Sequence, residues 1–184
     1  LDKDMQYSCG YFHNENISLD QAQKDKKEHI IKKLQINEKM NVLDIGCGWG
    51  GMAIEIAKQK NCEVTGISLS KNQINYCKNK AKELGLDNQV KFELADYREI
   101  NGQYDRIYSV GMFEHVGKKF YKAFFQSINK LLKEDGIFLL HTIGVVDQPS
   151  PPNKFINRYI FPGGICPSLS QIIKPIEKTG LIVA

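Results

Sequence analysis

The sequence predicts a doubly wound α/β fold, in which helices cover both faces of a parallel β-sheet. Short apolar runs of strand length alternate with longer helical patterns, as expected for βαβ units with right-handed crossovers. The first apolar run ends at a glycine cluster, residues 46–51. With 184 residues and 42% hydrophobic content, the chain is long enough to bury one core. We therefore expect one domain over residues 1–184, with strand order 3-2-1-4-5 and a ligand at the switch between strands 1 and 4.

An ordered lead-in segment, residues 5–17, precedes the first helix. Ser18 and Gln21 have the spacing of a capping box, and the helix extends to about residue 35. Its lysines are most simply a solvated face, with a phospholipid-facing patch as the alternative: Lys24, Lys26, Lys27, Lys32 and Lys33. A strand from Val42 and a helix to about residue 60 follow.

The remaining elements continue the alternation. Strands are expected at residues 63–67, 90–95, 106–110 and 137–143. Ser70 and Gln73 cap a helix that Gly85 closes. The other helices and loops are a helix at about 118–133 ended by Gly136, a loop at 149–152, a short aromatic segment at 155–161, and a helix at 168–179 interrupted at Pro175. Residues 181–184 resemble the start of a strand, so we expect a sheet truncated after about strand 5 or 6.

Composition limits the possible partners and compartment. A net charge of +4 and a pI of about 8.7 suit an anionic surface without requiring nucleic acid. No apolar run approaches the roughly 20 residues of a membrane span, and no signal peptide is visible. The odd number of cysteines, without C-x-x-C or zinc spacing, indicates reduced thiols and no metal site: Cys9, Cys47, Cys62, Cys77 and Cys166. We expect a cytoplasmic protein.

The glycine cluster predicts a nucleotide cofactor site at a strand-to-helix turn. Its glycines also satisfy the dinucleotide pattern G-x-G-x-x-G, but that pattern usually has an acid at the end of the next strand, where this chain has Ser68. Asp44 followed by Gly-x-Gly-x-Gly resembles instead the first motif of S-adenosyl-L-methionine (SAM)-dependent methyltransferases. A tight turn without a ligand is the remaining alternative, disfavoured because several glycines cost backbone entropy.

Six blocks in order resemble the cyclopropane-fatty-acyl-phospholipid synthases and the related mycolic acid synthases. They are the glycine turn and residues 5–12, 66–73, 109–117, 139–144 and 155–164. The resemblance runs from residue 5 to residue 184 and implies the class I SAM-dependent methyltransferase fold. It also implies transfer of a methylene group from SAM to the cis double bond of a phospholipid acyl chain, through a carbocation, with bound bicarbonate as the base.

The resemblance assigns roles to individual residues. The bicarbonate cradle consists of Glu114, His141 and the backbone at Cys9 and Ile143. A surface acid and a core histidine are the alternatives for Glu114 and His141. Cofactor-binding positions are Tyr7, Ser8, Asp44, Gly46, Cys47, Gly48, Gly50, Ser68, Gln73, Asp96, Tyr97 and Arg98. The acyl channel, with ordinary core as the alternative, is assigned to Tyr11, Phe12, Phe120, Phe124, Phe155, Tyr159 and Phe161.

Other functions are weighed against this one. A nucleic-acid amino-methyltransferase is excluded because residues 111–114 read Gly-Met-Phe-Glu rather than Asn/Asp-Pro-Pro-aromatic, and no basic groove pattern is present. Methylation of a small molecule, or a methyl-branched lipid, stays open. We expect unsaturated phospholipid acyl chains as substrate, transient contact with the inner face of the membrane, and a homo-oligomer. Relatives continue past Ala184, so an inactive fragment that binds SAM weakly is the non-enzyme alternative.

Overall fold

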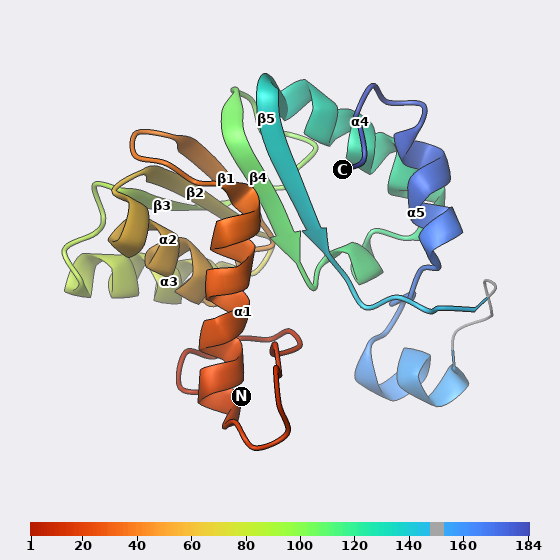
Figure 1. Cartoon of the computed structure of the whole chain (residues 1–184), viewed down its shortest axis with the longest axis horizontal. Helices are drawn as coiled ribbons and strands as arrows, with labels where there is room; N and C mark the ends of the chain where they lie inside the picture. Colours follow the sequence, from red (N-terminus) through yellow and green to blue (C-terminus); the bar gives the residue numbers. More distant parts are fainter. Residues whose placement is uncertain (148–152) are drawn as a thin grey trace.

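The computed structural model describes residues 1–147 and 153–184. Its centre is a five-stranded sheet in the order β3-β2-β1-β4-β5, with every neighbouring pair parallel (Figure 1). The strands are β1 (Asn41–Ile45), β2 (Glu63–Ser68), β3 (Val90–Leu94), β4 (Tyr104–Val110) and β5 (Leu132–His141). This is the predicted order, so the chain reverses direction along the sheet between β1 and β4, where doubly wound folds bind ligands.

Helices pack on both faces of the sheet (Figure 1). They are α1 (Leu19–Leu34), α2 (Gly51–Lys60), α3 (Lys71–Glu83), α4 (Tyr121–Leu131) and α5 (Leu169–Ile176), with short turns η1 (Phe113–His115), η2 (Lys118–Phe120) and η3 (Ile156–Ile160). Apolar residues of α1, α2 and α3 form one buried cluster, and those of α4 and α5 join a second. Within the described ranges, no helix has the length and apolar character to cross a bilayer.

The predicted helix starts are formed by hydroxyl caps. The Ser18 hydroxyl accepts a hydrogen bond from the Gln21 amide at 3.2 Å, and Ser70 accepts from the Gln73 amide at 3.4 Å. At α1 the Gln21 side chain bonds Asp25 instead of completing the box. The full reciprocal box occurs before α5, whose Pro175 lies inside the helix near its end.

The junction between α4 and β5 corrects the prediction. The helix ends at Leu131 and β5 begins at the next residue, so Gly136 lies within the strand and does not end the helix. Tyr104 pairs with Leu132 and Arg106 with Ile137, so residues 133–136 bulge out of the ladder opposite Asp105. Lys133 donates to Asp105 at 2.8 Å and ties this bulge to β4.

The regular ladder of β5 begins at Ile137, as expected, but the strand ends at His141 rather than at residue 143. Residues 181–184 adopt no regular secondary structure, whereas a strand start was expected. The aromatic segment contains the π-helical turn η3. The loop expected at residues 149–152 lies outside the described residues.

Candidate functional site

A cavity of about 710 Å³ opens at the carboxyl ends of β1 to β4. Its walls also come from residues 5–8 of the lead-in segment and from α1. The volume lies within the range of pockets for small organic ligands. The cavity occupies the crevice that the strand order predicts, and the turn after β1 forms its floor.

The glycine turn has the backbone that the sequence predicts. Gly46, Gly48 and Gly50 have φ angles of +87°, +54° and +80°, which residues with a Cβ rarely adopt. A Cβ at Gly46 would lie 2.8 Å from Met112 Cβ, so only glycine permits this close approach. Gly50 differs from the other two because it does not line the cavity, and a Cβ there would lie 2.8 Å from the Phe92 ring. Gly50 therefore allows the turn to pack closely against Phe92.

Asp44, at the end of β1, lines the cavity and is only 2% exposed. The Tyr108 hydroxyl donates a 2.8 Å hydrogen bond to its Oδ2. Burial raises the pKa of Asp44 to about 7, although the hydrogen bond opposes the shift. The carboxyl is therefore near the midpoint of its titration at neutral pH, and a cationic ligand would favour its ionised form.

Polar side chains follow β2 and β3 along the cavity wall. Ser68 Oγ donates to Gln73 Oε1 at 2.9 Å, and both line the cavity. Asp96 receives two bonds from the Arg98 guanidinium, at 2.9 and 2.6 Å, which lower the pKa of Asp96. Tyr97 lines the same wall and packs edge-on against a core ring. This edge presents hydroxyl, amide and carboxylate oxygens to a ligand.

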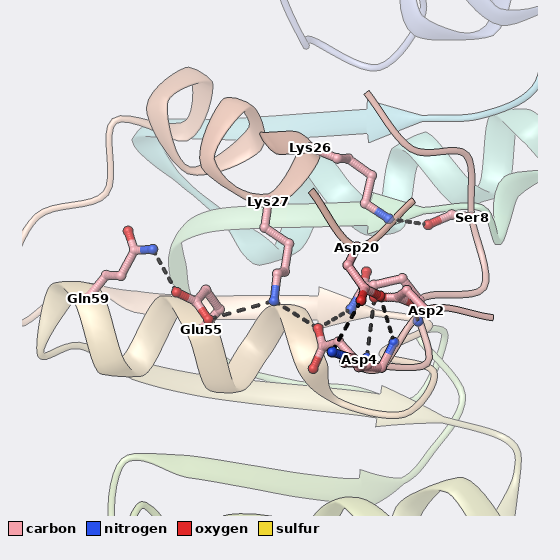
Figure 2. Close-up of polar contacts among 10 residues, drawn as sticks. Asp2, Asp4, Ser8, Asp20, Lys26, Lys27, Glu55 and Gln59 are labelled. Carbon is pink, nitrogen blue, oxygen red and sulfur yellow. Dashed lines mark hydrogen bonds and ion pairs between the residues drawn. The ribbon is translucent and has the colours of Figure 1, made fainter. Parts of the chain in front are cut away.

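Two lysines of α1 are buried, contrary to the prediction of a solvated face. Lys26 donates to Ser8 Oγ at 2.7 Å, and Lys27 lies between Asp4 at 2.8 Å and Glu55 at 3.6 Å (Figure 2). Ser8 of the lead-in segment and Asp4, just before it, cover this side of α1, and Glu55 comes from α2. Lys24, Lys32 and Lys33 are exposed, as expected.

The spacing of apolar residues could have identified Lys26. It lies four residues after Ala22 and four before Ile30, and both of these are buried. A lysine in the apolar stripe of a helix is unusual and indicates a specific partner. The sequence interpretation missed this residue, although it lines the cavity.

A second group of polar atoms lies beside the cavity. Glu114, in η1, is 8% exposed and its Oε1 accepts from the Ile143 amide at 2.7 Å. Among the described residues no partner reaches the buried atoms Glu114 Oε2, His141 Nδ1 and Tyr121 Oη. Burial lowers the pKa of His141, the charge of Lys26 lowers it further, and the charge of Glu114 opposes both. A mostly neutral imidazole therefore stands near an unpaired carboxylate oxygen.

The predicted catalytic residues adjoin the cavity but are not part of its lining. Ser8, Gly111, Met112 and His115 line it and are sequence neighbours of Cys9 or Glu114. The side chains of Cys9 and Ile143 are exposed. The structure thus brings Glu114, His141 and the Ile143 amide into one cluster at the cavity's edge.

The predicted channel residues divide into different environments. Phe120 lines the cavity and is 44% exposed. Phe161 makes edge contacts with Tyr7 at 6.4 Å and with His115 at 6.3 Å, both of which line the cavity. Phe124 is 0% exposed and packs among core rings, so the core alternative applies to it.

The other four channel candidates lie on the surface. Phe155 and Tyr159 are exposed, with ring centroids 5.3 Å apart. Tyr11 stacks on His29 at 4.8 Å, and Phe12 is 53% exposed. None of these four lines the cavity.

The five-stranded sheet and its terminal crevice define a class I SAM-dependent methyltransferase fold. All of residues 1–184 match the family model described as mycolic acid cyclopropane synthetase. The chain belongs to this family.

Three relatives show the extent of the similarity. The chain is 46% identical over 177 residues to the cyclopropane-fatty-acyl-phospholipid synthase of Escherichia coli, covering 96% of this chain and 45% of that protein. The solved structure of the cyclopropane synthase MmaA2 from Mycobacterium tuberculosis superimposes with a TM-score of 0.92 at 34% identity, covering 100% of this chain and 69% of that one. The mycolic acid cyclopropane synthase CmaA1 complexed with SAH and CTAB gives 0.91 at 34% identity, with the same coverage. The chain spans about half the length of the first curated relatives it matches.

Proposed function

We propose that this chain carries the methyl-transfer site of an enzyme that converts a cis double bond of a phospholipid acyl chain into a cyclopropane ring. The observation that carries the proposal is the cluster of unpaired polar atoms on Glu114 and His141 beside the cavity. The family membership and the named activity of the E. coli relative support the substrate class.

SAM fits the cavity by the chemistry of its walls, and when bound it supplies an electrophilic methyl group. Gly46 and Gly48 line the cavity without side chains, which leaves their backbone accessible to the ligand. Ser68 and Gln73 offer hydrogen bonds to a ribose. Asp44 offers a carboxylate whose ionisation offsets the positive charge of the donor.

The Glu114 cluster fits a small oxyanion such as bicarbonate. Glu114 Oε2 can accept the one O–H of bicarbonate, and His141 Nδ1 in its N–H tautomer can donate to another oxygen. Bicarbonate held there would supply the base that removes a proton during ring closure. The lowered pKa of His141 makes its imidazole a weaker base, so the ring donates a hydrogen bond and competes less for that proton.

Exposed aromatic and basic side chains support contact with a lipid surface. Phe120 lies at the cavity and carries Lys119 over its ring at 4.8 Å. Arg158 lies over the exposed Tyr159 ring at 5.4 Å. Aromatic rings prefer the membrane interface and cations favour anionic headgroups. We propose a transient, peripheral contact with phospholipid through these side chains.

Mass spectrometry of lipids tests the proposed function. The protein is incubated with SAM carrying a trideuterated methyl group and with vesicles of cis-unsaturated phosphatidylglycerol. Ring closure retains two deuterium atoms in the acyl chain, whereas simple methyl addition retains three. We expect the first result. We also expect Glu114→Gln to lower the yield at least about 100-fold, because the base that Glu114 holds in place would no longer be bound. Label that enters soluble acceptors but no lipid would contradict the proposal.

A further inference from the structure

Lys26 is a buried cation on the wall of the cavity. The residue is 3% exposed, and its ammonium donates to the neutral Ser8 hydroxyl at 2.7 Å (Figure 2). Within residues 1–147 and 153–184, no carboxylate forms an ion pair with it. An ammonium has three N–H donors, so the one hydroxyl leaves the group short of acceptors.

The neighbouring Lys27 provides the contrast within one helix. Its ammonium lies within ion-pair distance of Asp4 and Glu55, as buried charges normally do. Burial lowers the pKa of Lys26 to about 8, which reflects the incomplete compensation of its charge. The other charged or titratable groups that act on Lys26 are Asp2, Asp4, Cys9, Lys27 and His141.

The surroundings of Lys26 are built for a ligand. Gln23, one turn earlier in α1, fixes Ser8 by donating to its carbonyl at 2.8 Å, and Gln23 Oε1 is itself buried without a partner among the described residues. Ser8 also lies against the turn after β4, where a Cβ at Gly111 would be 3.3 Å from Ser8 Cβ. The ammonium is thus held at one end of the cavity by α1 and the lead-in segment.

We propose that Lys26 binds a carboxylate-class anion in the cavity. The anion is either the carboxylate at the amino-acid end of the methyl donor or bicarbonate in the Glu114 cluster. The carboxylate of the methyl donor is favoured because Lys26 and Ser8 both line the cavity. Bicarbonate is favoured because the charge of Lys26 acts on His141. The inference rests on the proposed function and names a residue that the sequence placed on a solvated face.

Calorimetry with two adenosyl ligands tests the first source. S-adenosylhomocysteine carries the amino-acid carboxylate, whereas 5′-methylthioadenosine lacks it. We expect Lys26→Met to weaken S-adenosylhomocysteine binding at least about tenfold, as for a lost charge-assisted contact, and to leave 5′-methylthioadenosine binding within about twofold. The matched control is Lys24→Met, because Lys24 is exposed on the same helix, and it should behave as wild type.

Bicarbonate titration of turnover tests the second source. If bicarbonate is the partner, Lys26→Met raises the half-saturating bicarbonate concentration at least about tenfold while S-adenosylhomocysteine binding is unchanged. If Lys26→Met equals wild type both in its affinity for S-adenosylhomocysteine and in its half-saturating bicarbonate concentration, the inference is overturned and the proposed function is left intact. Failure of the wild-type protein to bind S-adenosylhomocysteine would overturn both.

A measurement on the wild-type protein covers the case in which Lys26→Met does not fold. The NMR signal of the Lys26 ε-methylene should shift on addition of S-adenosylhomocysteine or bicarbonate and should stay in place with 5′-methylthioadenosine. A signal that none of the anions moves would overturn the inference.

Discussion

The buried Asp44 makes stability depend on pH in a way that a single substitution should remove. Its pKa is raised from 3.8 to about 7, so between these values the folded state keeps a proton that the unfolded state has lost. Stability therefore falls as pH rises from about 4 to 7, and the loss is complete above pH 7. A difference of roughly 3 pKa units, at about 1.4 kcal/mol each, corresponds to about 4 kcal/mol.

Asp44→Asn keeps the shape and can still accept the Tyr108 hydrogen bond. We expect the variant to equal wild type within about 1 kcal/mol near pH 4.5 and to exceed it by roughly 2 to 4 kcal/mol at pH 8. Urea unfolding at half-unit pH steps measures this difference, and titrating groups common to both proteins cancel in it. Asp87→Asn, at an exposed position, is the control and should follow the wild-type curve.

Two results would test the raised pKa of Asp44. If Tyr108→Phe moves the decline in stability to higher pH, the hydroxyl does lower the pKa of Asp44, as its geometry requires. Parallel curves for Asp44→Asn and wild type would refute the argument, because they would mean that the carboxylate ionises in the folded protein as it does in water.

Three further predictions concern the turn, the core and the lead-in segment. Gly46→Ala should abolish S-adenosylhomocysteine binding in calorimetry, since its Cβ would lie 2.8 Å from a side chain. Gly48→Ala should weaken binding less, because within 4 Å its Cβ would meet no described residue other than its chain neighbours. Phe124→Ala should cost about 3 to 5 kcal/mol in urea unfolding, whereas Phe120→Ala should cost under about 1 kcal/mol and raise the KM for lipid. Lys27→Met should speed proteolysis of residues 1–8 several-fold, because it removes the ion pair with Asp4; an unchanged cleavage rate would contradict this.

Local sequence patterns predict the fold and the glycine turn. The alternation of strands and helices gives the sheet order, and the positive φ angles of Gly46 and Gly48 follow from a requirement that only glycine meets easily. The buried Lys26 could not be recognised from charge alone, because the lead-in segment that covers it comes from a different part of the chain. The early start of β5 was missed for a similar reason, since pairing with β4 and not a local signal defines the bulge.

Aromatic side chains one helical turn apart were also hard to assign to the cavity or to the core. Phe120 and Phe124 lie one turn apart, yet one faces the cavity and the other the core. Phe120 is the last residue of η2, whereas Phe124 lies in α4, which begins at Tyr121. Glu114 follows β4 and His141 is the last residue of β5, and the two come together only because these strands are neighbours in the sheet.

A crystal structure of the protein with S-adenosylhomocysteine and bicarbonate tests the central claim most directly. We expect the adenosyl ligand in the crevice between β1 and β4, its sulfur turned toward Glu114 and His141, and a small anion bonded to Glu114 Oε2 and His141 Nδ1. An adenosyl ligand outside this crevice, or Glu114 and His141 side chains directed away from the ligand's sulfur, would contradict it.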